Sequence, residues 1–168
     1  MDGCRSTPYR SPVQRLSRFE EEDYIGGMMM IVRTATPEDE TDVTQLWRHC
    51  NLVASYNDPA TDFRFAMLGP NSTVLVRETG GRICGSVMVG HDGHRGWLYY
   101  VASAPDQQRQ GTGKAMIEAG EQWLRDRNVL KVQLMIRDTN TAVVPFYERF
   151  GYEESHRILM GKWLDQTD

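Results

Sequence analysis

Residues 99–114 read Y-Y-V-A-S-A-P-D-Q-Q-R-Q-G-T-G-K, and a short loop here joins an aromatic-rich strand to a long amphipathic helix. Gly111 and Gly113 allow the backbone to approach a ligand closely and to present successive N–H groups. The helix that begins there adds the positive end of its dipole, and Arg109 and Lys114 add formal charge. The pattern predicts a binding site for an anion such as a pyrophosphate at the junction of strand and helix.

Two familiar phosphate-binding loops do not match this segment. A P-loop requires G-x-x-x-x-G-K-[ST], whereas only Gly111 and Gly113 precede Lys114, and Ala115 follows it. A dinucleotide fingerprint requires a third glycine, and Met116 stands in its place. Taken alone, the segment could equally well be a glycine-containing loop that only turns the chain before a helix. The rest of the sequence must therefore distinguish an anion-binding loop from a structural turn.

Strands and helices alternate on both sides of the loop. Thr36-Pro37 and Asn57-Asp58-Pro59 are typical starts of helices, and Gly80-Gly81 and Asp92-Gly93 are typical turns between antiparallel strands. We expect strands at residues 30–33, 73–79, 83–89, 96–103, 132–136 and 158–163, and helices at 36–50, 59–67, 113–128 and 141–150. The fold class is therefore α/β (α+β), with one antiparallel meander over residues 73–103.

The composition is that of one globular domain of 168 residues, with 40% hydrophobic and 25% charged residues. A net charge of −4 argues against a basic nucleic-acid-binding surface. The longest apolar run, residues 28–32, is far shorter than the roughly 18 residues of a membrane span. Three widely spaced cysteines, an odd number, favour reduced thiols and a cytoplasmic location over a disulfide framework.

Residues 1–27 differ in composition from the rest, because four arginines precede an acidic block at residues 20–23 and large apolar residues are sparse. We expect a dispensable, disordered N-terminal extension here and a single domain over residues 28–168. Two alternatives stay open. The segment could be an organelle transit peptide, or it could lie upstream of the true start, since three methionines follow at residues 28–30.

A second motif lies about 27 residues beyond Gly113, where Asn140 is followed by Tyr147 and then by Gly151-Tyr152. Together with Gln108, Gly111 and Gly113, which fill a Q/R-x-x-G-x-G/A pattern, this motif resembles the GNAT superfamily of N-acetyltransferases. The resemblance extends over residues 30–163. Residues 56–59 and 90–96 look like those of a narrower bacterial subgroup, the YpeA-like acetyltransferases.

The resemblance implies a mostly antiparallel mixed sheet of about six strands, flanked by about four helices. It also implies that the fourth and fifth expected strands, 96–103 and 132–136, splay apart so that the pantetheine of acetyl-CoA lies between them. No metal is implied. The residues that would bind this cosubstrate are Val101, Ala102 and Ser103 through the backbone, the loop residues Gln108, Arg109, Gln110, Gly111, Thr112, Gly113 and Lys114 around the pyrophosphate, and Asn140 at the pantetheine arm.

Tyr147 stands where the family places a tyrosine beside the thioester sulfur, and a phenol there can protonate the departing thiolate. The competing interpretation is a core aromatic that packs with Phe146 and Phe150 on an amphipathic helix. The resemblance favours the general-acid role. Pro145 is tolerated in this helix if it lies in the first turn.

The general base is less clear, because Met135 occupies the position of a glutamate that related peptide acetyltransferases carry. Candidates for a base or for acceptor binding are Asn57, Asp58, His91, Asp92 and His94. The simpler interpretation of Asp58 is helix capping and that of Asp92 is turn formation. The H-x-x-H spacing lacks a third ligand for zinc.

The leading hypothesis is an acetyltransferase that moves an acetyl group from acetyl-CoA directly to a primary amine of a small molecule or peptide, in a ternary complex. The alternative is a non-catalytic domain that binds or senses acyl-CoA. Nucleic acid and membranes are not expected as partners, a monomer or a homodimer is expected, and the amine acceptor cannot be read from the sequence.

Overall fold

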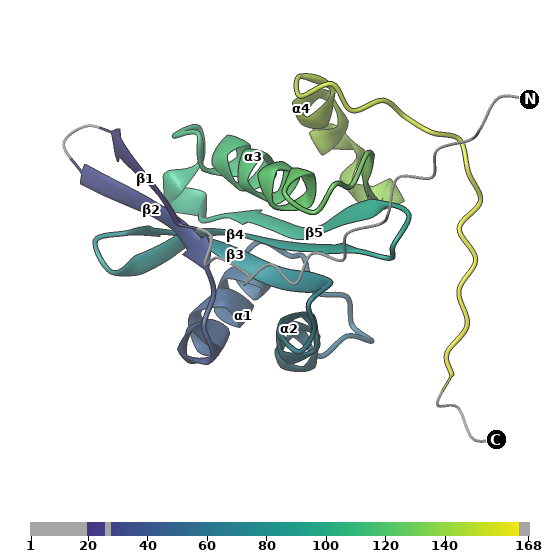
Figure 1. The fold of residues 1–168 in the computed structure, drawn as a ribbon, viewed down its shortest axis with the longest axis horizontal. Helices are drawn as coiled ribbons and strands as arrows, with labels where there is room; N and C mark the ends of the chain where they lie inside the picture. The colour runs from purple at the N-terminus through teal and green to yellow at the C-terminus, as the bar shows by residue number, and fades with distance from the viewer. Residues whose placement is uncertain (1–19, 26–27, 165–168) are drawn as a thin grey trace, which may run out of the picture. The chain divides into compact units, whose positions relative to one another are not determined.

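The computed structural model describes residues 20–25 and 28–164. The chain divides into two compact units, Met1–Leu134 and Met135–Asp168. The first unit contains the sheet and the long helices, and the second contains one short α-helix and the segment that follows it (Figure 1). The expected single domain over residues 28–168 stays a prediction.

Within the described residues, six strands form one sheet in the order β1-β2-β3-β4-β5-β6 (Figure 1). The first four pairings are antiparallel and the β5–β6 pairing is parallel, so the expected mixed, mostly antiparallel sheet is confirmed. The strands are β1 (Glu20–Ile25), β2 (Met28–Thr34), β3 (Ser72–Thr79), β4 (Arg82–His91), β5 (Gly96–Ser103) and β6 (Val132–Leu134).

The described residues form four α-helices, the number expected, and their ends follow the predicted capping chemistry. The short 3₁₀ turn η1 (Pro37–Asp39) leads into α1 (Glu40–His49), and the Asp39 carboxylate accepts the Thr36 backbone N–H at 2.7 Å. Asp58 caps α2 (Pro59–Met67) by accepting the Ala60 N–H. The other two are α3 (Thr112–Arg125) and α4 (Val144–Glu148).

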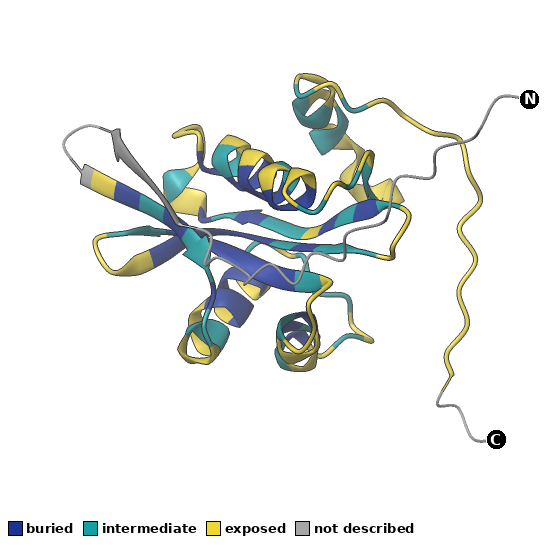
Figure 2. Cartoon of the chain, in the orientation of Figure 1, coloured by how far each residue is buried: buried dark blue, intermediate teal, exposed yellow. Residues whose placement is uncertain are grey.

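Both faces of the sheet carry a hydrophobic core, because α3 covers one face and α1 and α2 cover the other (Figure 1). Trp47 and Phe63 fill the core beneath α1 and α2, where the Trp47 indole donates to Ser86 Oγ at 2.9 Å. On the α3 side the fully buried side chains include Leu98, Met116 and Ile117. Figure 2 shows buried residues along the middle strands of the sheet and on the inner face of α3.

Gly85 on β4 allows the first turn of α3 to lie close to the sheet. A Cβ atom at this position would come within 2.5 Å of Thr112 Cγ2 and 3.2 Å of Met116 Cγ. Thr112 is correspondingly only 1% exposed, although it is the first residue of its helix. A side chain at position 85 would therefore push the start of α3 away from the sheet.

Two expectations for the chain ends differ from the structure. Residues 20–25, predicted to belong to a disordered extension, form strand β1 and pair with β2, which supplies an edge for their backbone hydrogen bonds. The rest of the predicted extension, residues 1–19 and 26–27, lies outside the described residues.

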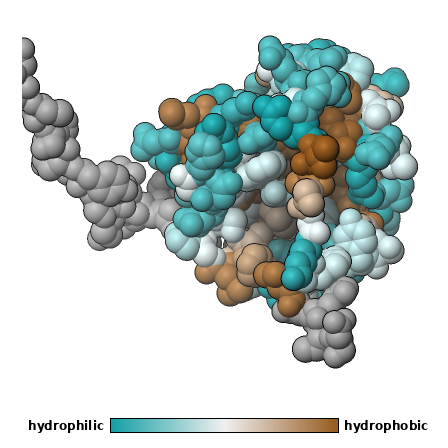
Figure 3. Space-filling model, turned by 90° about the vertical axis from the view of Figure 1, so that its right-hand side faces the viewer, coloured by the Kyte–Doolittle hydropathy of each residue, from teal (hydrophilic) through white to brown (hydrophobic). Residues whose placement is uncertain are grey.

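The predicted last strand at residues 158–163 is the second correction. These residues form no strand, and Ile158 and Met160 are 92% and 88% exposed. A strand requires a hydrogen-bonded neighbour, and no described strand pairs with this segment. Figure 3 shows that hydrophobic residues reach the surface of the face that it draws.

Replacing Gly85 with alanine should destabilise the protein by about 1–3 kcal/mol, because the added methyl group overlaps Thr112 and Met116. Urea unfolding of wild type and Gly85→Ala measures the difference. Gly161→Ala is the matched control, since an added Cβ there meets no atom within 4 Å. Equal destabilisation by both substitutions would contradict the close seating of α3.

Candidate functional site

Strand β5 is paired on both sides only over its first residues. Its parallel pairing with β6 joins Gly96 to Val132, Trp97 to Gln133 and Leu98 to Leu134, and it ends there. Residues 99–103 therefore have no parallel partner strand among the described residues. This stretch contains Val101, Ala102 and Ser103, the predicted backbone contacts of an acyl-CoA. The parallel partner is shorter than the expected strand 132–136, because β6 ends at Leu134, and the expected splay between the two strands stays a prediction.

A bulge in β5 lies at the point where the parallel pairing has stopped. The β4–β5 register shifts between Ser86 and Met88, and Tyr100 adopts a left-handed conformation with φ of 49°. Such a conformation is strained for a bulky residue, so contacts of its side chain must hold it. The bulge changes the face of the sheet on which the following residues of β5 lie. Ser103, for example, pairs with Gly85, which lies on the face of the sheet that α3 covers.

The contacts that hold Tyr100 come from α1, α2 and the loop between them. Its ring stacks on Trp47 with centroids 4.1 Å apart, and its hydroxyl donates to Asp62 Oδ2 at 2.6 Å. Asn57 Nδ2 donates to the same hydroxyl at 3.2 Å. Of the acceptor-side candidates, only Asn57 belongs to this network. Sequence reasoning missed Asp62 and Tyr100, because a bulge leaves no sign in a Y-Y pair.

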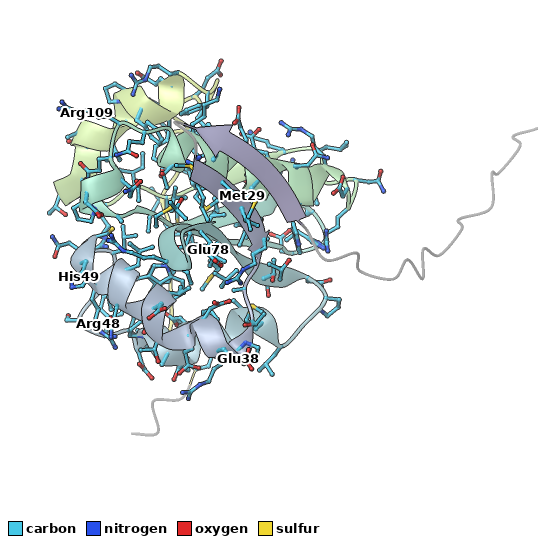
Figure 4. All side chains as sticks on the ribbon, turned by 90° about the vertical axis from the view of Figure 1, so that its left-hand side faces the viewer. Met29, Glu38, Arg48, His49, Glu78 and Arg109 are labelled. Atoms are coloured by element: carbon cyan, nitrogen blue, oxygen red, sulfur yellow. The ribbon has the colours of Figure 1, made fainter. Side chains whose placement is uncertain are left out.

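The loop after β5 exposes its backbone. Arg109 and Gly111 both have left-handed backbones, with φ of 62° and 78°. When right-handed and left-handed residues alternate along a loop, successive backbone N–H groups line a concave surface that can bind an anion. Gly111 is exposed, and a Cβ there would meet nothing within 4 Å. Gln108, Arg109 and Gln110 are exposed as well, and Figure 4 labels Arg109 at this end of the molecule.

The start of α3 lacks the acidic groups that usually complement a helix dipole. Its N-cap is Gly111, which has no capping side chain, and no acidic residue lies in its first turn. Ala115 donates to the Gly111 carbonyl, whereas the N–H groups that precede Ala115 in the first turn have no partner inside the helix. Unpaired donors and the positive dipole end together favour an anion.

Side chains from neighbouring elements form hydrogen bonds and ion pairs with residues of this loop. Arg82 of β4 binds Asp106 with N–O distances of 2.6 and 3.0 Å, in the 3₁₀ turn η2 (Pro105–Gln107). Gln110 Nε2 donates to the Asp106 carbonyl. The ammonium group of Lys114 lies 3.6 Å from the carboxylate of Glu118, one helical turn further along α3, and both side chains are exposed. Thr112 and the half-buried Gly113 complete the predicted pyrophosphate loop.

The remaining candidates for a base lie in local structural motifs. Asp58 accepts from the Ala60 N–H and from Thr61 Oγ1, as a helix cap does. Asp92 accepts from the N–H groups of His94 and Arg95 and from the Trp97 indole, and these bonds lower the pKa of its carboxyl to about 2.

His91 and His94 share the turn before β5 with Asp92, and the His91 ring accepts from the Gly93 N–H at 3.3 Å. This turn precedes β5, whereas the loop with Gly111 follows it. The strand of eight residues therefore separates the two ends by roughly 23 Å. The structure brings His91, Asp92 and His94 together but not with Asn57, which contacts Tyr100.

The second unit contains Asn140 and Tyr147. Asn140 is exposed in the 3₁₀ segment η3 (Asp138–Val143), with a non-helical backbone. Tyr147 lies on α4 in an aromatic group, with ring centroids 5.2 Å from Phe146 and 5.8 Å from Tyr152. Burial raises the pKa of the Tyr147 phenol, so the group is protonated at neutral pH and can serve as a proton donor. Pro145 lies in the first turn of α4, as predicted.

Two cysteines fall within the described residues, and neither resembles an activated nucleophile. Cys84 is 2% exposed and its thiol donates to the Arg77 carbonyl. Burial raises the pKa of the Cys50 thiol, whereas an activated thiol has a lowered pKa. Over residues 20–25 and 28–164, no group of three potential metal ligands forms and no helix is long and apolar enough to span a membrane.

Residues 40–152 match the model of the acetyltransferase (GNAT) family. An acetyltransferase from Yersinia pestis is 38% identical over 135 residues, which cover 80% of this chain and 96% of that protein. An acetyltransferase from Pectobacterium atrosepticum matches with the same identity and the same coverage.

Solved structures of low sequence identity share the fold. An aminoglycoside N-acetyltransferase in complex with CoA superimposes with a TM-score of 0.71 at 15% identity, over 82% of this chain and 97% of that one. Glucosamine-6-phosphate N-acetyltransferase from Arabidopsis thaliana superimposes with a TM-score of 0.61 at 21% identity, over 81% and 99%.

Substitutions of Asp58 separate a helix cap from a catalytic base. Asp58→Ala should lower the urea midpoint of unfolding because α2 loses its cap, whereas Asp58→Asn should retain both stability and turnover, since an amide oxygen also caps a helix. A base would behave in the opposite way, because asparagine cannot accept a proton. Loss of turnover in Asp58→Asn at unchanged stability would contradict the capping role.

Proposed function

Because this chain belongs to the acetyltransferase (GNAT) family, we propose that it transfers an acetyl group from acetyl-CoA to a primary amine by direct attack within a ternary complex. The observation that carries the proposal is the open start of α3 beside the unpaired part of β5. One element offers free N–H donors and a dipole to phosphates, and the other offers a strand edge to the pantetheine arm.

The donor site is proposed to consist of the loop after β5, the open edge of β5 and Asn140. Residues 108–114 would bind the pyrophosphate through N–H groups, with Arg109 and Lys114 adding charge. Val101, Ala102 and Ser103 would pair with the amides of the pantetheine as an added strand does, and an N–H near Val101 would polarise the thioester carbonyl. Asn140 would bind the pantetheine arm.

The chemical step forms a C–N bond and breaks a C–S bond. The neutral amine attacks the thioester carbonyl carbon, and the tetrahedral intermediate expels the CoA thiolate as its carbonyl reforms. Tyr147 would give its phenolic proton to this thiolate, and the proton lost from the amine nitrogen would pass to water or to a side-chain base. The two described cysteines support direct transfer, because neither is suited to carry the acetyl group.

The acceptor is proposed to approach from the face of β5 that carries Tyr100. There the Asp62 carboxylate lies 2.6 Å from the Tyr100 hydroxyl, and a carboxylate can hold an ammonium group before it loses its proton. Two of the structures named above are an aminoglycoside N-acetyltransferase and a glucosamine-6-phosphate N-acetyltransferase, so amino sugars are the first amines to test, beside polyamines and peptides.

Steady-state kinetics test the proposal. Release of CoA thiol should require an amine, and plots of initial velocity against acetyl-CoA at several amine concentrations should intersect, as a ternary complex demands. The mass of the protein should stay unchanged after incubation with acetyl-CoA alone. Parallel lines together with an acetylated protein would contradict direct transfer, and CoA binding without turnover of any amine would favour the non-catalytic alternative.

Tyr147→Phe should lower kcat by about 10²-fold and leave the affinity for acetyl-CoA nearly unchanged, because the ring is kept and only the proton donor is lost. The loss should shrink with acyl donors whose thiols leave more readily. Tyr152→Phe removes a hydroxyl from the same aromatic group and should keep kcat near wild type. A Tyr147→Phe enzyme with wild-type kcat would leave Tyr147 with a packing role alone.

A further inference from the structure

Arg77 on β3 is a buried cation without a buried anion. It is only 2% exposed, yet no described carboxylate forms an ion pair with it. Its guanidinium donates to Thr112 Oγ1 at 3.1 Å and to Met30 Sδ at 2.7 Å, and its Nε has no hydrogen-bond partner. Burying a charge that has only weak acceptors and one unsatisfied donor costs free energy, and a bound anion would offset this cost.

The position of Arg77 points to where that partner binds. Arg77, Gly85 and Ser103 occupy one row across β3, β4 and β5, and this row lies beneath the first turn of α3. The absence of a side chain at Gly85 lets Thr112 lie close to the sheet, and the Arg77 guanidinium donates to Thr112 Oγ1 at this helix start. Ser103 Oγ in the same row is also buried without a partner. Two buried polar atoms without partners, Arg77 Nε and Ser103 Oγ, therefore belong to the row beneath the first turn of α3.

The helix start makes the charge of Arg77 more unfavourable. A cation near the N-terminus of a helix faces the positive end of the dipole, and α3 carries no acidic residue in its first turn. By contrast α2 has Asp58 as its cap and Asp62 in its first turn. An anion bound at the start of α3 would compensate the helix end and the guanidinium together.

We propose that Arg77 is a positioning residue of the phosphate site: it holds Thr112 at the start of α3 and takes a bound phosphate group as its counter-charge. This inference rests on the proposed use of a phosphate-bearing acyl donor. Arg77 acts through Thr112 and through its field, so it should determine affinity for the phosphates and not the rate of acetyl transfer.

Arg33 on the adjacent strand β2 provides a matched control. Its guanidinium already has two carboxylate partners, Asp39 at 2.6 Å and Glu78 at 2.9 Å. Its charge is therefore compensated within the protein, and removing it should cost stability without affecting phosphate binding. Comparing the Arg33 and Arg77 variants thus distinguishes a cation that stabilises the fold from one that compensates the charge of a bound phosphate.

The experiment measures CoA and pantetheine binding by calorimetry, the melting temperature without ligand, and kcat, for wild type, Arg77→Met, Arg77→Lys and Arg33→Met. Pantetheine carries the thiol arm but no phosphate. Arg77→Met should weaken CoA binding at least about tenfold, leave pantetheine binding and kcat unchanged, and not lower the melting temperature. Arg77→Lys should recover part of the CoA affinity. Arg33→Met should lower the melting temperature and keep wild-type CoA affinity.

Thr112→Val tests the same link if Arg77→Met does not fold, since valine keeps the shape of threonine and removes only the hydroxyl that accepts from Arg77. It should weaken CoA binding and not pantetheine binding. If wild type binds CoA and these variants bind it equally well, or if they lose CoA and pantetheine alike, the role of Arg77 is refuted and the proposed function stands. If wild type does not bind CoA, the proposed function fails together with this inference.

Discussion

The close packing of the first turn of α3 against β3 and β4 is the constraint on which the rest of the site depends. Gly85 leaves the space, Thr112 fills it, and Gly111 turns the chain into the helix with a left-handed backbone. A helix seated in this way points unpaired N–H groups and its positive dipole end at the exposed loop. The packing that buries Met116 and Ile117 in the core thus also forms the candidate anion site at the start of the same helix.

Strand β5 links this anion site to the place where an acyl group would lie. It is paired with β6 only as far as Leu98, and beyond that residue it offers an edge. The bulge at Tyr100 lies in the open part and is held by Trp47, Asp62 and Asn57 from the helical side of the sheet. Because those contacts come from α1, α2 and their loop, different elements would build the proposed acceptor side and the proposed donor side of β5.

The sequence predicted those parts of the fold that local chemistry determines. Thr36-Pro37, Asp58-Pro59 and the glycine turns specify helix starts and hairpins within a few residues, and the structure has them. The predictions failed at the chain ends. Residues 20–25 pair with the next strand, β2, although their charged composition predicted no strand, whereas residues 158–163 pair with no described strand. The loop around Gly111 was recognisable by its spacing, but Arg77, Asp62 and the Tyr100 bulge were not, because their roles arise only from tertiary contacts.

Binding of the phosphates of an acyl-CoA at the start of α3 is tested most directly by calorimetry with a single substitution. Gly113→Glu adds a side chain and a negative charge where a phosphate has to approach, and Gly161→Glu adds the same charge at a position with open space. Wild type and Gly161→Glu should bind CoA with the same affinity, and Gly113→Glu should show little or no binding while remaining folded. Equal affinity of Gly113→Glu and wild type would contradict phosphate binding at the start of α3.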